Sequence, residues 1–195
     1  MNAPRTAVPI KAVIFDMDGL LLDTEGIYTE VTQIIAERYG RTYDWSVKQH
    51  IIGRGAQDLA DYVVKALVRH LKAHNIPIAV GTSSSRNSFG HKTTLHREWF
   101  GLFDTIVTAD DPEVGAAKPA PDIFLTAARR LGVAPGDCLV FEDSPFGVTA
   151  AKAAHMTAIA VPDEAMADSK YQHADQIIRK LADFDLAAYG LPPMS

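Results

Sequence analysis

The sequence predicts an α/β protein with three layers, in which a parallel sheet lies between two layers of helices. Short runs of β-branched and other apolar residues recur along the chain, as in strands that are buried on both faces. From residue 76 onward these runs alternate with stretches of helical periodicity. This alternation is typical of helices that cross between parallel strands, and it predicts a Rossmann-like core.

The expected strands are short and apolar, and several of them end in polar residues. The first has the sequence KAVIFD, the second IPIAVGT and the fourth CLVFE. The third, TIVT, is shorter, and the sixth is expected at an edge of the sheet. In chain order the expected strands are residues 11–16, 76–82, 105–108, 138–142, 157–161 and 174–178.

Turn and capping residues set the bounds of the expected helices. Gly40 ends the first helix. Pro121 stands near the first position of a later helix, and Gly132 lies just past its end. Ser144 is expected to cap the helix that follows the fourth strand. The expected helices are residues 26–38, 58–74, 121–131 and 145–154, with a partly helical stretch over residues 88–100.

Composition limits the classes of function. The chain has 195 residues, of which 47% are hydrophobic and 22% charged, so it can bury a core of its own. The net charge is −5 and no run of basic residues occurs, which argues against a nucleic-acid partner. No apolar run is long enough to span a membrane. The single cysteine, Cys138, cannot form an intrachain disulfide, so we expect a cytoplasmic protein.

Reactive polar residues follow three of the expected strands. Asp16 ends the first strand and Asp18 lies just beyond it, Thr82 ends the second, and Glu142 and Asp143 stand at the end of the fourth. The carboxyl ends of parallel strands meet at one edge of the sheet, where such sheets bind their ligands. We therefore expect these side chains to lie together.

Lys118 lies in the loop between the third and fourth strands and is expected at the same edge. Carboxylates, a hydroxyl and a lysine are the groups that Mg²⁺-assisted phosphoryl transfer requires. Mg²⁺ prefers oxygen ligands, and it offsets the charge of a phosphate so that an anionic carboxylate can attack phosphorus. The lysine balances the charge that remains.

Four segments place the chain in a known group. FDMDG, GTSSS, GAAKPAPDIF and FEDSPFG occur in the order of the four motifs of the haloacid dehalogenase superfamily of phosphohydrolases, which the chain resembles. Longer stretches are similar to the pseudouridine-5'-phosphatase group within that superfamily. These stretches are FDMDGLLLDTE, FDTIVTADDPEVGAAKPAPDIF, CLVFEDSPFGV and DFDLAAYGLPP. The resemblance covers nearly the whole chain.

The resemblance implies a role for each catalytic candidate. Asp16 is the nucleophile that forms an aspartyl-phosphate, and Asp18 is the general acid for the leaving group and then the base that activates water. Thr82 and the Ser83 backbone N–H bind the phosphoryl group, with the Ser83 side chain as the alternative to Thr82. Lys118 holds Asp16 and the phosphate together.

The resemblance also implies a magnesium site. Asp16, Asp143 and the backbone carbonyl of Asp18 are the expected ligands. Glu142 is a further ligand, either directly or through a water molecule. Gly19 permits the tight turn beside the nucleophile.

Relatives in this group carry a helical cap between the first and second motifs, and here that interval is short. A four-helix cap needs about 60 to 70 residues, whereas residues 24–67 are all that remain beside the core. DLADYVVKAL and VRHLKAHNIPIAV join without a turn residue, as after an internal deletion in a splice variant or a truncated paralogue. We expect residues 1–23 and 68–195 to form the core, and residues 24–67 to form a partial cap.

The sequence thus predicts a Mg²⁺-dependent phosphomonoester hydrolase. Its expected substrate is a small sugar phosphate or nucleotide-like phosphate such as pseudouridine 5'-phosphate. Two alternatives remain open: a weakly active or non-catalytic isoform that binds a partner through its incomplete cap, and a phosphosugar mutase. A monomer is expected, or weak self-association through exposed apolar cap surface.

Overall fold

The computed structural model describes residues 9–22, 57–163 and 165–194, with the side chains of residues 57–63 left out of that description. The expected helix over residues 26–38 and most of the expected cap lie outside the described residues.

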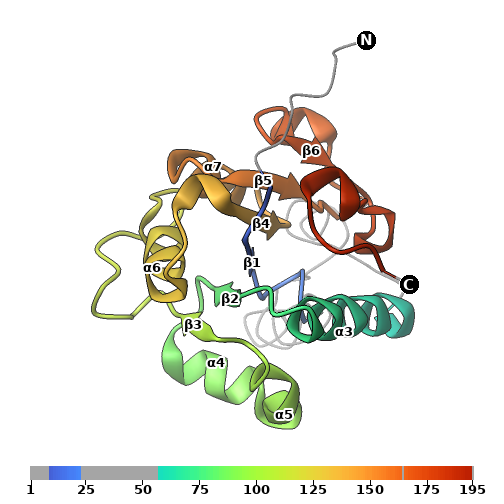
Figure 1. Ribbon diagram of the computed structural model, residues 1–195. Coiled ribbons are helices and arrows are strands. Elements are labelled where there is room, and N and C mark those ends of the chain that lie inside the picture. Colours follow the sequence, from blue (N-terminus) through green and yellow to red (C-terminus); the bar gives the residue numbers. More distant parts are fainter. Residues whose placement is uncertain (1–8, 23–56, 164, 195) are drawn as a thin grey trace, which may run out of the picture.

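Six parallel strands form a single sheet in the order β3-β2-β1-β4-β5-β6 (Figure 1). The first strand in the chain, β1, lies inside the sheet and pairs with both β2 and β4, so that Ile14 lies opposite Ala79 and Val140. The predicted α/β fold with a parallel sheet is confirmed. The strands are β1 (Ala12–Phe15), β2 (Ile78–Gly81), β3 (Thr105–Val107), β4 (Cys138–Glu142), β5 (Thr157–Ala160) and β6 (Gln176–Ile177).

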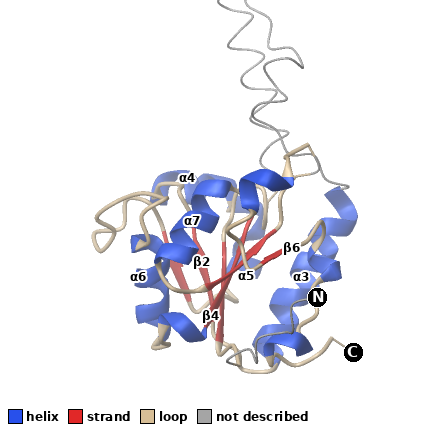
Figure 2. Ribbon diagram, turned by 90° about the horizontal axis from the view of Figure 1, so that it is seen from above, coloured by secondary structure: helices blue, strands red, loops and turns tan. Residues whose placement is uncertain are grey.

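Helices cover both faces of this sheet, as Figures 1 and 2 show. On one face α6 (Asp122–Leu131) packs against β1, β2 and β3, and α7 (Pro145–Ala153) packs against β4 and β5. On the other face α3 (Gln57–Ala73) packs against β2. The three-layer arrangement follows from the apolar runs, because strands without a polar face must be covered on both sides.

Alternation along β1 assigns its side chains to two separate cores. Val13 and Phe15 join the core on the α3 side, and Ala12 and Ile14 join the core under α6 and α7. This is the period of two that a strand imposes. Phe15 stacks on Phe141 of β4, with their ring centroids 5.4 Å apart, so aromatic packing fixes the middle of the sheet.

The stretch predicted as partly helical over residues 88–100 divides into α4 (Arg86–Lys92), a 3₁₀ turn and α5 (Arg97–Phe100). The expected start was two residues late because Ser85 is the N-cap of α4 and accepts a hydrogen bond from the Ser88 N–H at 3.2 Å. The helix ends where the Thr93 hydroxyl donates to the Phe89 carbonyl at 2.8 Å. Such back-bonding by a β-branched residue weakens a helix.

The other described elements lie within a few residues of the predicted bounds. Helix α3 runs unbroken past residues 67 and 68, where the two sequence segments join without a turn. It ends at Ala73, and Asn75 just beyond it has a φ of 56°, in the left-handed region. Gly132 has the left-handed conformation expected just past the end of α6. No helix in the described ranges is both long and apolar enough to cross a membrane.

Cys138 opens β4 in the middle of the sheet and is fully buried. Its thiol lies 3.5 Å from the carbonyl oxygen of Ala134. Burial, with the nearby charge of Asp137 in addition, raises the pKa of this thiol to about 12. The cysteine is therefore a small apolar core residue here.

Tyr171 should contribute to stability through its hydroxyl. This residue is fully buried in a 3₁₀ turn (Asp168–Tyr171) and donates to the backbone carbonyl of Asp143 at 2.6 Å. The Tyr171→Phe variant removes the donor and leaves a buried acceptor, so we expect the free energy of unfolding to fall by about 1–3 kcal/mol. Urea denaturation measures this difference.

Tyr189→Phe is the matched control. The Tyr189 hydroxyl donates to Gln176 at 2.9 Å, but the residue is only partly buried, so water can replace the lost donor. We expect a smaller loss for this control. Equal losses in the free energy of unfolding for the two variants would show that burial does not increase the contribution of the Tyr171 hydrogen bond to stability.

Candidate active site

The structure brings the predicted polar residues to one edge of the sheet. Asp16 directly follows β1, Thr82 directly follows β2, and Glu142 is the last residue of β4, with Asp143 next to it. Because β1 lies between β2 and β4, the three strand ends are neighbours. The topology alone therefore collects residues that are more than 120 positions apart in the chain.

Lys118 lies within this group and is almost completely buried. Its Nζ donates to Asp16 Oδ1 at 2.5 Å and to the Gly81 carbonyl at 3.0 Å, and it also pairs with Glu142 Oε1. The Lys118 side chain is 4% exposed, and its ammonium lies 4.7 Å from the ring centroid of Phe124. A buried ammonium is tolerated because two carboxylates compensate its charge.

Burial shapes the ionisation of both partners. Burial raises the pKa of Asp16 to about 7, although the charge of Lys118 opposes this and that of Glu142 adds to it. For Lys118, burial lowers the pKa, but the charges of Asp16 and Glu142 outweigh it and hold the pKa above its usual value. Lys118 therefore stays protonated, whereas Asp16 needs further positive charge nearby to be fully ionised at neutral pH.

Glu142 is held at the N-terminus of α7. Its Oε2 accepts hydrogen bonds from both the N–H and the hydroxyl of Ser144 at 3.0 Å. Ser144 is the predicted N-cap of α7, and its hydroxyl accepts from the Gly147 N–H at 3.0 Å. A Cβ at Gly147 would lie 1.8 Å from Glu142 Oε1, so the glycine leaves the space that the carboxylate fills. The positive end of the helix supports the negative charge.

Asp143 lies against the turn that follows β1. Gly19 in that turn has φ of +85°, and a Cβ there would lie 2.2 Å from Asp143 Oδ2. Burial raises the pKa of Asp143 well above its usual value, and the charges of Asp16 and Glu142 act in the same direction. Within the described residues Asp143 forms no ion pair. Lys118 opposes this rise only through its charge, whereas it forms direct ion pairs with the other two carboxylates.

This group of carboxylates suits a hard divalent cation. Asp16, Glu142 and Asp143 each offer an oxygen, and these atoms lie within 4.8 Å of one another. When all three are ionised, the ammonium of Lys118 balances only one of their charges. Oxygen donors with excess negative charge are what Mg²⁺ requires, so the residues present fit that ion.

A second group surrounds Asp18. Its Oδ1 pairs with Lys92 Nζ at 2.6 Å, and its Oδ2 accepts from the Ser84 hydroxyl at 2.8 Å and lies 3.5 Å from the Thr82 hydroxyl. Thr82 is fully buried and Ser83 is exposed. Three serines follow Thr82 in the sequence, and this run of hydroxyl groups was the signal that could have pointed to Ser84 as a site residue. Sequence reasoning missed Lys92, because no motif marks the end of the following helix.

Asp110 and Asp111 shape the loop that follows β3. Asp110 Oδ1 accepts from the Thr108 hydroxyl at 2.8 Å and from the Arg86 N–H at 2.7 Å. Arg130 binds both oxygens of Asp111, at 2.7 and 2.8 Å, and its hydrogen bonds lower the pKa of that carboxyl group. These contacts anchor the start of the loop that leads to Lys118.

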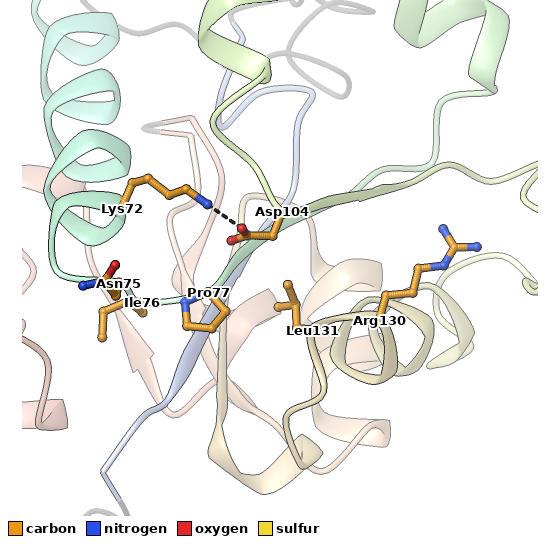
Figure 3. Close-up of a pocket in the computed structure, with 7 residues that line it drawn as sticks. All are labelled: Lys72, Asn75, Ile76, Pro77, Asp104, Arg130 and Leu131. Carbon is orange, nitrogen blue, oxygen red and sulfur yellow. Dashed lines mark hydrogen bonds and ion pairs between the residues drawn. The ribbon is translucent and has the colours of Figure 1, made fainter.

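A hollow of about 300 Å³ lies at the opposite edge of the sheet, where β2 and β3 begin (Figure 3). Its charged groups are already paired: Lys72 with Asp104, and Arg130 with Asp111. It is therefore a weaker candidate for a reactive site than the group around Lys118. Its lining residues are Lys72, Asn75, Ile76, Pro77, Asp104, Arg130 and Leu131.

Known proteins resemble the chain over nearly its whole length. It is 41% identical to a probable pseudouridine-5'-phosphatase of Drosophila melanogaster, over 92% of this chain and 93% of that protein. It is 42% identical to (DL)-glycerol-3-phosphatase 2 of Arabidopsis thaliana, over 94% of this chain and 92% of that protein.

Both relatives are longer than this chain within the aligned region. The alignment with the Drosophila protein spans 215 positions, but 92% of this 195-residue chain is only about 179 residues. About 36 positions of that relative therefore have no counterpart here. The same comparison with the Arabidopsis protein, over 222 positions and 94% of the chain, leaves about 39.

Solved structures share the fold. A HAD family hydrolase from Deinococcus radiodurans, solved with bound phosphate and sodium, has a TM-score of 0.78 at 24% identity and covers 95% of this chain and 99% of its own. A putative beta-phosphoglucomutase from Thermotoga maritima has a TM-score of 0.68 at 26% identity, over 87% of this chain and 94% of its own. The model of the haloacid dehalogenase-like hydrolases matches residues 39–155, which is more than half of the sequence. The chain is thus a member of the haloacid dehalogenase-like hydrolase family.

Proposed function

We propose that this protein is a phosphatase that hydrolyses phosphomonoesters through an aspartyl-phosphate at Asp16. The observation that carries the proposal is the buried contact between Lys118 and Asp16, 2.5 Å long and surrounded by Glu142 and Asp143. A carboxylate beside a fixed ammonium and two further acidic groups is arranged to receive a phosphoryl group. The names of the two relatives, both phosphatases, support the same activity.

Mg²⁺ is the proposed cofactor, with Asp16, Asp143 and the backbone carbonyl of Asp18 as its ligands. When bound, the ion offsets the negative charge of the phosphoryl group. Both oxygens of Glu142 already accept hydrogen bonds, from Lys118 and Ser144, which favours a contact through water for this residue.

In the proposed reaction, a carboxylate oxygen of Asp16 attacks phosphorus while the bond to the leaving-group oxygen breaks. Lys118 holds Asp16 and the transferred oxygens, and the Thr82 hydroxyl and the Ser83 N–H bind the phosphoryl group. Asp18 gives its proton to the leaving oxygen. It then takes a proton from the water that attacks the aspartyl-phosphate, which releases phosphate and restores Asp16.

The proposed substrate is a small phosphorylated metabolite. The two named relatives give two alkyl phosphates to test, pseudouridine 5'-phosphate and glycerol 3-phosphate. The likeness to a putative beta-phosphoglucomutase at 26% identity keeps a phosphosugar mutase as the second candidate. The two reactions differ in product, because only the phosphatase releases inorganic phosphate.

We further propose that the positions missing relative to the relatives belong to the cap. Residues 24–67 then form a partial cap, and residues 1–23 and 68–195 form the core. The unbroken course of α3 through residues 67 and 68 supports an internal deletion at that join. A weakly active or non-catalytic isoform that binds a partner, or associates weakly with itself, is the alternative. The lone, buried Cys138 is in keeping with a cytoplasmic protein.

The Asp16→Asn variant tests the nucleophile. It keeps the size of the side chain but removes the attacking carboxylate, so we expect phosphate release to fall on the order of 10³-fold or more. The measurement is Mg²⁺-dependent release of inorganic phosphate from pseudouridine 5'-phosphate and glycerol 3-phosphate. Wild-type protein that is folded, yet releases no more phosphate than the variant, would favour the non-catalytic isoform.

The Gly147→Ala variant tests whether the position of Glu142 matters. The new methyl group would overlap the Glu142 carboxylate and displace it from Lys118. We expect kcat/KM to fall by about tenfold or more, because small misplacements in an active site are costly. Gly136→Ala is the control, since a Cβ there meets nothing within 4 Å. Equal activity in the two variants would contradict a role for Glu142.

The pH dependence of stability tests the environment of Asp16. Its pKa is about 7 in the folded protein and 3.8 as an ordinary aspartate, so the folded state binds this proton more tightly. The resulting stability is fully present below about pH 4 and is lost as pH rises towards 7. In EDTA, urea denaturation between pH 5 and 7 should show a steeper fall for wild type than for Asp16→Asn. Parallel falls would refute the assignment, and added Mg²⁺ should reduce the wild-type fall.

A further inference from the structure

We propose that Lys92 is a positioning residue for the reaction, which acts with Ser84 to hold the Asp18 carboxylate where it can transfer a proton. The inference rests on the proposed function, because it assigns Asp18 the role of general acid and base. The proposal assigns neither Lys92 nor Ser84 a contact with the phosphoryl group. Both act through Asp18.

The geometry is a closed triangle of contacts. Lys92 Nζ lies 2.6 Å from Asp18 Oδ1 and 2.9 Å from the Ser84 hydroxyl oxygen, and that hydroxyl donates to Asp18 Oδ2 at 2.8 Å. Each carboxylate oxygen therefore has its own partner, and the two partners also contact each other. A carboxylate held at both oxygens cannot rotate freely, whereas one held at a single oxygen can.

The local fold explains why a lysine from the far end of a helix reaches this point. Lys92 is the last residue of α4, which begins two residues after Ser84. Side chains on a helix lean towards its N-terminus, so the long lysine side chain runs back to the loop that follows β2. Through its ammonium group, Lys92 thus links Asp18 in the loop after β1 to Ser84 in the loop after β2.

The triangle is also anchored to the rest of the site. The Ser84 N–H donates to the Thr82 hydroxyl at 3.0 Å, and the Ser84 carbonyl accepts from the Ala109 N–H at 3.0 Å. The Lys92 and Asp18 side chains are 16% and 27% exposed, so water competes less for their contact than at an open surface. A displacement of Asp18 by about 1 Å can cost up to 10²-fold in rate.

The test compares two kinds of leaving group in the Lys92→Met variant. Pseudouridine 5'-phosphate and glycerol 3-phosphate leave as alkoxides and need a proton from Asp18, whereas p-nitrophenyl phosphate leaves as a stable phenolate and does not. Because kcat/KM covers the steps up to departure of the leaving group, we expect it to fall about 10- to 100-fold for the alkyl phosphates. For p-nitrophenyl phosphate we expect a change of less than about threefold.

Several variants make the comparison specific. Asp18→Asn should show the same preference for the aryl substrate, and Lys92→Arg should recover part of the lost activity because it keeps the charge and the donors. Lys72→Met is the matched control, since it removes a lysine–aspartate pair at the opposite edge of the sheet. It should leave both substrates unaffected.

The ratio of kcat/KM for the two substrates, measured on one sample, does not depend on how much of that sample is folded. Equal losses for both substrates in Lys92→Met would assign Lys92 a merely structural role and overturn the inference, as would no loss at all. A wild-type protein that hydrolyses neither substrate would overturn the proposed function itself, and this inference with it.

Discussion

The rest of the structure depends on one buried ion pair, between Lys118 and the carboxylates of Asp16 and Glu142. Its members come from three separate parts of the chain, and none of them is tolerable in the interior alone, because an uncompensated buried charge costs several kcal/mol. Glu142 needs the N-terminus of α7, and that approach needs a glycine at position 147. Each buried charge therefore restricts which residues can stand next to it in the sequence.

The topology of the sheet explains how such distant residues meet. Because β1 has β2 and β4 as its neighbours, residues that leave any of these three strands emerge at adjacent points of one edge. The two separate cores on either face hold those strand ends in place. The residues that stabilise the fold and those of the candidate site thus lie in different places. Apolar side chains pack the sheet, and the polar groups lie at the carboxyl ends of its central strands.

Much of this was predictable from sequence, for reasons that are local. Apolar runs marked strands β1 to β5, and Pro121, Gly132 and Ser144 marked helix ends, because those signals depend on neighbouring residues alone. The end of α4 and the part played by Lys92 were not predictable. They depend on how a side chain folds back over a loop, and no spacing rule records that. The pairing of Glu142 with both Lys118 and Ser144 was likewise visible only in three dimensions.

Cys138 is a natural chemical probe of how often the sheet opens. Its thiol starts a central strand, is shielded from solvent, and has a pKa so high that almost no reactive thiolate exists at neutral pH. An alkylating reagent can therefore modify it only when the centre of the sheet opens. The rate of labelling then reports how often β4 separates from its neighbours, at a single site, without any engineered probe.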